Sequence, residues 1–156
     1  MMPHMAKPFS VERSVTVEAS VHDVYGHIVD LKKWNAWSPW ADLDPAMDQQ
    51  FTGPPQGTGQ SMAWKGNRKV GMGSMTITDA KPDEKVSLDL TFLKPFIATN
   101  TVDIDLIPRG RITEVQWVMR GELNLVMQAM NKVKPMDAML GPDFERGLAN
   151  LKRVSE

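Results

Sequence analysis

The sequence predicts a single α+β domain in which an antiparallel sheet is covered on one face by a long C-terminal helix. Between residues 60 and 120, apolar and polar residues alternate in short runs separated by tight turns. This pattern is typical of hairpin-connected strands with one buried face. Toward the C-terminus the spacing of apolar residues changes to that of a helix, which predicts the element that covers the sheet. Two short helices are expected directly after the first strand.

Composition narrows the class of protein. The chain has 156 residues, enough for one domain with its own core. Its formal net charge is −1 and it has no basic run, which argues against a nucleic-acid partner. Cysteine is absent, so no disulfide or thiolate site is expected, and we predict a cytoplasmic location. No apolar stretch approaches the about 20 residues of a membrane span, so we expect no integral membrane association.

The first strand and the two helices follow from local signals near the N-terminus. Residues 1–8 lack the apolar core of a signal peptide, and we expect a disordered N-terminus or a cloning remnant there. Residues 9–17 alternate and predict the first strand. Ser20 stands three residues before Asp23, a pairing that opens a helix, and Asp30 is placed to cap a second, shorter helix that carries two tryptophans.

The middle of the chain predicts a meander of strands. The expected strands are residues 60–64, 71–80, 86–92, 101–106 and 113–119. The glycine pairs at 57/59 and 71/73 precede no helix and no lysine-serine or lysine-threonine step, so they do not predict a phosphate loop. We interpret them as turn and bulge positions.

The C-terminal part predicts a helix from about residue 124 to 154. Its apolar stripe recurs at steps of three and four, at Met136, Leu140, Phe144, Leu148 and Leu151. Lys152 and Arg153 lie in the last turn, where cations complement the helix dipole. Pro135 and the pair Gly141-Pro142 are expected to interrupt the helix once or twice.

This order of elements resembles the helix-grip fold, in which a curved antiparallel sheet, here of about six to seven strands, wraps around the terminal helix and leaves a cavity between them. Several segments of the sequence are similar to those of the SRPBCC superfamily, in particular of its polyketide cyclase/dehydrase-like branch. The resemblance implies one SRPBCC-like domain over residues 9–154. The matching segments are Val17-Glu18-Ala19-Ser20, residues 30–40 with their W-x-x-W-S-P-W run, Phe51 with Gly53, Gly57 and Gly59, Trp64-Lys65-Gly66, Gly71-Met72-Gly73, residues 113–117 and Phe144-Glu145-Arg146-Gly147-Leu148.

The candidate ligand-binding residues are large apolar side chains on the expected covered face, together with one amide. Asn100 shares its strand phase with Val102, so it is expected to point inward and to orient the polar end of a ligand. The alternative for each apolar residue is ordinary core, and Trp34 is expected to hold the short helices against the sheet. The set comprises Trp37, Trp40, Trp64, Leu90, Phe92, Asn100, Trp117, Met119, Met130, Met139 and Phe144.

Catalytic and metal-binding motifs are missing from the sequence. His4, His22 and His27 have no metal-ligand spacing, and no G-x-S-x-G motif is present. We therefore expect no metal and no cofactor.

The preferred function is binding of a hydrophobic small molecule, such as a lipid, polyketide, isoprenoid or aromatic compound, by a monomer or weak homodimer. The alternatives are a cyclase/dehydratase-type enzyme and an interaction module similar to chaperone-ATPase activators. An enzyme would need a polar group in the cavity, and the available candidates are Tyr25, His27, Asn100 and Arg120.

Overall fold

The computed structural model describes residues 7–41, 43–94, 97–124, 127–129 and 135–156. Seven strands form one antiparallel sheet in the order β1-β7-β6-β5-β4-β3-β2. Every pair of spatial neighbours except β1 and β7 is also consecutive in the chain, so short turns make most connections, as the alternating pattern predicted. The strands are β1 (Lys7–Val17), β2 (Asp48–Thr52), β3 (Ser61–Lys65), β4 (Met72–Lys81), β5 (Lys85–Lys94), β6 (Ala98–Arg109) and β7 (Ile112–Leu123).

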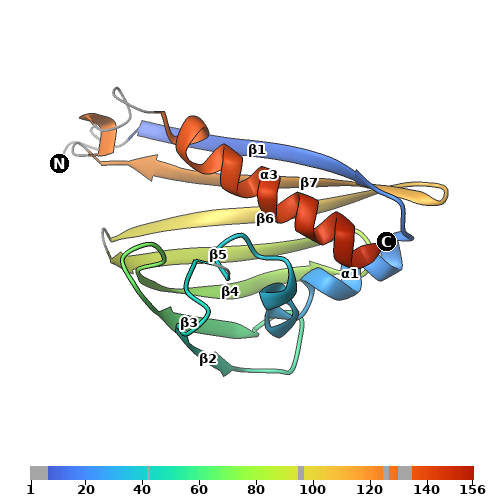
Figure 1. The fold of residues 1–156 in the computed structure, drawn as a ribbon, viewed down its shortest axis with the longest axis horizontal. Coiled ribbons are helices and arrows are strands. Elements are labelled where there is room, and N and C mark those ends of the chain that lie inside the picture. Colours follow the sequence, from blue (N-terminus) through green and yellow to red (C-terminus); the bar gives the residue numbers. More distant parts are fainter. Residues whose placement is uncertain (1–6, 42, 95–96, 125–126, 130–134) are drawn as a thin grey trace.

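The helices lie on one face of the sheet. The long helix α3 (Met136–Ser155) crosses β1, β7 and β6, and the short α1 (Val21–Ile28) lies near its C-terminal end (Figure 1). A 3₁₀ helix, η2 (Leu31–Ala36), follows α1. This is the helix-grip arrangement expected from the sequence. None of the described helices is long and apolar enough to cross a membrane.

The caps of the two short helices are the ones predicted. The Ser20 hydroxyl accepts a hydrogen bond from the Asp23 backbone N–H at 3.2 Å, and an Asp30 carboxylate oxygen accepts from the Lys32 N–H at 3.0 Å. Each cap satisfies a donor that the first helical turn leaves unpaired.

The structure corrects two element boundaries and adds one strand. β1 begins at Lys7 rather than Phe9, because Lys7 and Pro8 already stand opposite Leu123 and Glu122 of β7. β2 was not predicted as a strand, since its residues are mostly polar and it occupies the sheet edge. α3 begins at Met136 rather than near residue 124, with helical conformation also at residues 127–129.

The predicted interruption at Gly141-Pro142 is wrong, because α3 is unbroken from Met136 to Ser155. Pro142 cannot donate to the carbonyl of Ala138. Ala138 and Pro142 are both exposed, so water can hydrogen-bond to the free carbonyl of Ala138 and the helix continues. Pro135 does end the helix on the N-terminal side, at the N-cap position.

The core forms between the sheet and α3. Strand residues of one phase point toward the helix, among them Val11, Leu88, Ile104 and Val115, and each is at most 1% exposed. The helix contributes Phe144, Leu148 and Leu151. The predicted stripe of α3 therefore does bury its apolar side against the alternating strands, although its first members, Met136 and Leu140, are only partly buried.

Candidate functional site

The tryptophan run is tied to the end of α1 by its indole groups. Trp34 Nε1 donates to the carbonyl of Ile28 at 2.9 Å, and Trp37 Nε1 donates to the carbonyl of His27 at 3.0 Å. Carbonyls in the last turn of a helix have no partner within the helix, so the two indoles act as its C-terminal partners. Both side chains are almost fully buried, and the two hydrogen bonds hold the run against the end of α1.

A cluster of aromatic rings joins this run to the sheet and to α3. Trp117 of β7 stacks on Phe144 of α3 with ring centroids 4.4 Å apart and an interplanar angle of 3°. Trp37 and Trp40 meet Trp117 edge to face at 5.7 and 6.0 Å. α3 approaches closely here, because a Cβ at Gly147 would lie 2.8 Å from a ring carbon of Pro39. The cluster fixes the spacing between helix and sheet.

Beside this cluster the helix and the sheet separate and leave a larger cavity of about 390 Å³. Its apolar wall comes from η2, β3–β7 and α3, and the loop residues between them. It comprises Leu31, Trp34, Trp40, Met47, Met62, Trp64, Val70, Met75, Leu88, Leu90, Phe92, Val102, Trp117, Met139 and Leu140. Its polar lining consists of Asn35, Ser38, Gln49, Arg68, Lys69, Lys94 and Asp143.

A smaller cavity of about 140 Å³ adjoins the larger one. The two share four lining residues, Trp40, Leu90, Phe92 and Leu140. The other residues of the smaller cavity are Phe9, Ala98, Asn100, Met119, Met127 and Met136. The volume of the larger cavity falls within the range of small-molecule sites, about 300–1,000 Å³.

Most of the candidates named from the sequence lie on these walls. Trp40, Leu90 and Phe92 line both cavities, Trp64, Trp117 and Met139 line the larger one, and Asn100 and Met119 line the smaller one. Trp37 and Phe144 line neither, since both are buried in the aromatic cluster. Met130 lies outside the described residues.

Several lining residues were not among those candidates. Leu140 belongs to the predicted stripe of α3, and Phe9 to the inward phase of β1, so both carried a usable signal in the sequence. Arg68, Lys69 and Lys94 carried none, since they stand in or beside turns where charged residues are common.

Among the described residues that line the smaller cavity, Asn100 alone is polar. It is 4% exposed, and its side-chain oxygen fills the space above Gly121, where a Cβ would lie 2.0 Å from it. Among the described residues, no hydrogen-bond partner of its side-chain amide is found. The amide lines the smaller cavity, so it offers a donor and an acceptor to a polar atom of a ligand.

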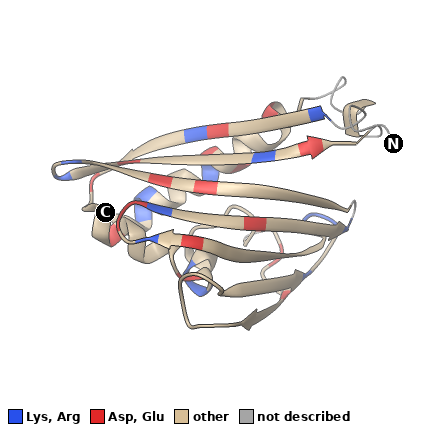
Figure 2. Cartoon of the chain, turned by 180° about the vertical axis from the view of Figure 1, so that it is seen from behind, with Lys and Arg blue, Asp and Glu red and all other residues tan. Residues whose placement is uncertain are grey.

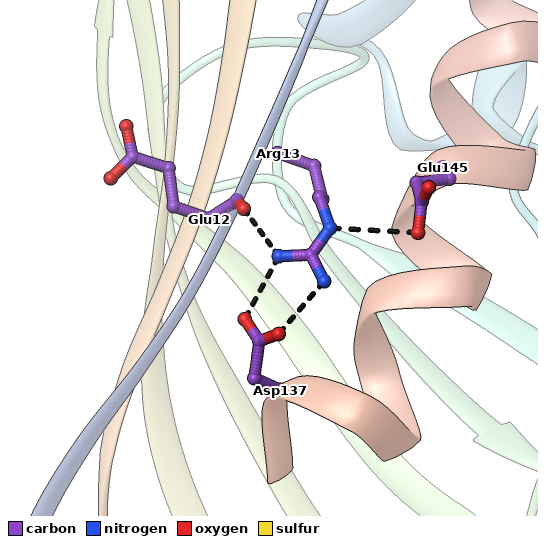
Figure 3. A network of polar contacts seen from close by, with 4 residues as sticks. All are labelled: Glu12, Arg13, Asp137 and Glu145. Atoms are coloured by element: carbon purple, nitrogen blue, oxygen red, sulfur yellow. Dashed lines mark hydrogen bonds and ion pairs between the residues drawn. The ribbon is translucent and has the colours of Figure 1, made fainter.

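An ion-pair network anchors the N-terminal end of α3. Residues of this helix line both cavities. Figure 3 shows Arg13 of β1 reaching toward α3, where it donates to both carboxylate oxygens of Asp137 at 2.8 and 2.9 Å. Its Nε lies 3.5 Å from a carboxylate oxygen of Glu145. The hydrogen bonds from Arg13 hold the pKa of Asp137 below its ordinary value, and Asp137 in turn raises the pKa of Arg13.

The guanidinium of Arg13 lies directly over Gly141, where a Cβ would be 2.1 Å from its Nη2. Asp137, Gly141 and Glu145 are spaced four residues apart and share one side of the helix. The glycine leaves room for the arginine between the two acids.

Three of the polar residues named from the sequence as candidates for catalysis, Tyr25, His27 and Arg120, lie away from the two cavities. Burial raises the pKa of Tyr25, and burial together with Lys33 lowers the pKa of His27, but neither residue lines either of these two cavities. Arg120 pairs with Asp103 at 3.1 Å on the outer face. Asp143 is the only carboxylate among the described lining residues, and it lies 3.2 Å from Arg146.

A comparison with known protein families identifies the family of this chain. The model of a family described as polyketide cyclase / dehydrase and lipid transport matches residues 8–156. The chain belongs to this family. No curated protein matches the sequence.

Solved structures share the fold at low identity. Norcoclaurine synthase from Thalictrum flavum has a TM-score of 0.67 and 10% identity, over 97% of this chain and 88% of that one. A protein of unknown function from Staphylococcus aureus has a TM-score of 0.69 and 13% identity, over 96% and 94%. The di-domain ARO/CYC protein BexL from the BE-7585A biosynthetic pathway has a TM-score of 0.65 and 18% identity, over 96% of this chain and 50% of that one. At these identities the likeness supports the fold alone.

Proposed function

We propose that this protein binds one small or medium-sized hydrophobic molecule in the adjoining cavities between the sheet and α3. The observation that carries the proposal is the wall of the larger cavity, which is built from aromatic, methionine and aliphatic side chains around about 390 Å³. Burial of apolar area supplies roughly 25 cal/mol per Å². The family description, which includes lipid transport, supports the same class of ligand.

The amide of Asn100, which lines the smaller cavity, would orient the bound molecule. Because this amide has no partner among the described residues, a hydroxyl or carbonyl group of the ligand that reaches the smaller cavity gains a hydrogen bond there. The apolar remainder then extends past Trp40 and Leu90, which line both cavities.

Displacement of a neutral fluorescent probe, N-phenyl-1-naphthylamine, tests the proposal. Leu140→Trp places a larger side chain where both cavities meet, and we expect probe affinity to fall at least about tenfold. Ala149→Trp is the matched control, because Ala149 lies on the exposed side of the same helix. Equal affinity in the wild type and a folded Leu140→Trp variant would contradict the proposal.

Native mass spectrometry with organic extraction complements this assay. A defined lipid or aromatic mass that co-purifies with the wild type, and is lost in Leu140→Trp, would identify the class of ligand.

A cyclase-type enzyme is the second candidate, and the presence of Asp143 on the cavity wall favours it. A carboxylate at this position is a candidate base for condensation of a reactive chain. If the protein is such an enzyme, conversion of a linear poly-β-ketone should be lost in Asp143→Asn while binding of the neutral probe persists. Binding without conversion in the wild type would support the carrier.

A further inference from the structure

Three cationic side chains line the larger cavity at one end of the sheet. Arg68 and Lys69 lie in the turn between β3 and β4, and Lys94 is the last residue of β5. Met72, the first residue of β4, stands opposite Lys94, so the turn and the end of β5 are neighbours. Figure 2 shows basic segments at this end of the sheet. All three residues are exposed, and we call them the mouth cations.

Most of the other polar groups that line this cavity are already paired. Asn35 donates to the side-chain oxygen of Gln49 at 2.8 Å, and Gln49 donates back to Asn35 at 3.0 Å. The carboxylate of Asp143 is held by Arg146.

The mouth cations differ, because no ion pair or side-chain hydrogen bond of theirs is found among the described residues. Asp44 lies near the turn, but its two oxygens accept from the backbone N–H groups of Ala46 and Asn67 at 3.2 and 2.8 Å. The chain as a whole carries a formal charge of −1. Three positive charges that have no partner among the described residues, at the edge of an apolar cavity, are therefore a local concentration of charge that attracts an anion.

Resting on the ligand-binding function proposed above, we infer that the ligand is an anionic amphiphile whose carboxylate or phosphate head lies among the mouth cations. Its hydrocarbon tail would occupy the larger cavity. About 390 Å³ is near the lower end of the volumes of small-molecule sites, which favours one chain over a two-chain lipid. Phe92 and Lys94, near the end of β5, both line the larger cavity.

The test compares dodecanoate and dodecyl phosphate with the neutral 1-dodecanol, each displacing N-phenyl-1-naphthylamine from the wild type. At 20 mM salt we expect the two anions to bind at least about tenfold more tightly than the alcohol, which corresponds to about 1.4 kcal/mol. The preference should shrink at 500 mM salt, since the Debye length then falls well below 10 Å.

Two triple variants with the same change in net charge locate the effect. Neutralising the mouth cations with Arg68→Gln, Lys69→Gln and Lys94→Gln should abolish the preference for anions while dodecanol still binds. The control combines Lys81→Gln, Arg111→Gln and Arg153→Gln, which are exposed cations that line neither cavity, and it should keep the preference.

Equal affinity for dodecanoate and dodecanol would overturn this inference and leave hydrophobic binding standing. If no amphiphile displaces the probe and the probe itself does not bind, the proposed function fails as well. Cosedimentation with phosphatidylglycerol vesicles that depends on the mouth cations, together with equal affinities, would assign these charges to a bilayer surface and also overturn the inference.

Discussion

Gly73 of β4 lies beneath the ring of Trp64, at the edge of the larger cavity. A Cβ built on Gly73 would be 2.2 Å from the backbone oxygen of Thr91 and 2.6 Å from Cη2 of Trp64. Trp64 cannot simply turn aside, because its Nε1 donates to the carbonyl of Val70 at 2.8 Å and its ring meets Phe92 edge to face at 5.7 Å. Gly73→Ala therefore forces either the backbone of β5 or the tryptophan to move.

The expected cost follows from two opposing terms. Replacing a strand glycine by alanine alone stabilises by roughly 0.5–1 kcal/mol. Ordinary Cβ contacts begin at 3.4 Å, so Thr91 must shift by about 1 Å, and such overpacking costs about 1–3 kcal/mol. We expect a net loss of about 1–2 kcal/mol, or a fall in Tm of about 2–8 °C for a chain of this length. Displacement of Trp64 should also weaken probe binding.

Urea and thermal unfolding followed by tryptophan fluorescence measure this loss, and probe titration measures the effect on the cavity. Gly26→Ala is the control, because Gly26 lies inside α1 and a Cβ there meets nothing within 4 Å. It should stabilise by about 0.8–1 kcal/mol. A Gly73→Ala protein as stable as the wild type, with unchanged probe affinity, would refute the reasoning from these distances.

Three further predictions concern stability. Trp117→Ala should lower the free energy of unfolding in urea by about 3–5 kcal/mol, because Trp117 is 2% exposed and its ring is stacked on Phe144. A loss below about 1 kcal/mol would show that the stack is dispensable. Gln60→Ala should lower the free energy of unfolding by about 1–3 kcal/mol. The buried amide of Gln60 accepts from the Leu31 N–H at 2.7 Å and donates to Asp30 and to the Pro55 carbonyl. The control Gln56→Ala, at an exposed position, should change stability very little. Hydrogen bonds from Arg13 lower the pKa of Asp137 in the folded state below its ordinary 3.8, so this pair stabilises the fold at neutral pH and its contribution disappears as pH falls through the folded-state pKa. Asp137→Asn should thus be less stable than the wild type at pH 7, and the difference should shrink as pH falls below 3.8. A difference independent of pH would exclude the charge as its cause.

Strands with a clear two-residue period were predictable from the sequence, and strands without it were not. Residues 86–92 and 101–106 alternate cleanly because only one face of β5 and β6 is buried. β2 escapes prediction because its Gln49 and Gln50 show no apolar period at the sheet edge. The interruption at Pro142 was predicted wrongly, since local chemistry cannot show that the freed carbonyl is open to solvent.

The candidate site was only partly predictable for a similar reason. Trp37 and Trp40 are equivalent in the sequence, both large and three residues apart. The hydrogen bond from Trp37 to His27 buries one of them in the core, while the other lines both cavities. Which ring lines a cavity depends on how α1 meets the sheet, and no local pattern encodes that contact.

The sequence by itself determined the fold class, the order of the elements and the covered face of the sheet, because periodicity and capping are local and repeat along the chain. Only the tertiary structure decided where the core ends and the cavities begin. Helix and sheet touch at Trp117 and Phe144 and separate a few residues away, and this divergence sets the space. The same packing brings Arg68 and Lys69 to the end of β5 near Lys94 and places Asn100 on the wall of the smaller cavity, since these positions depend on neighbours distant in the chain.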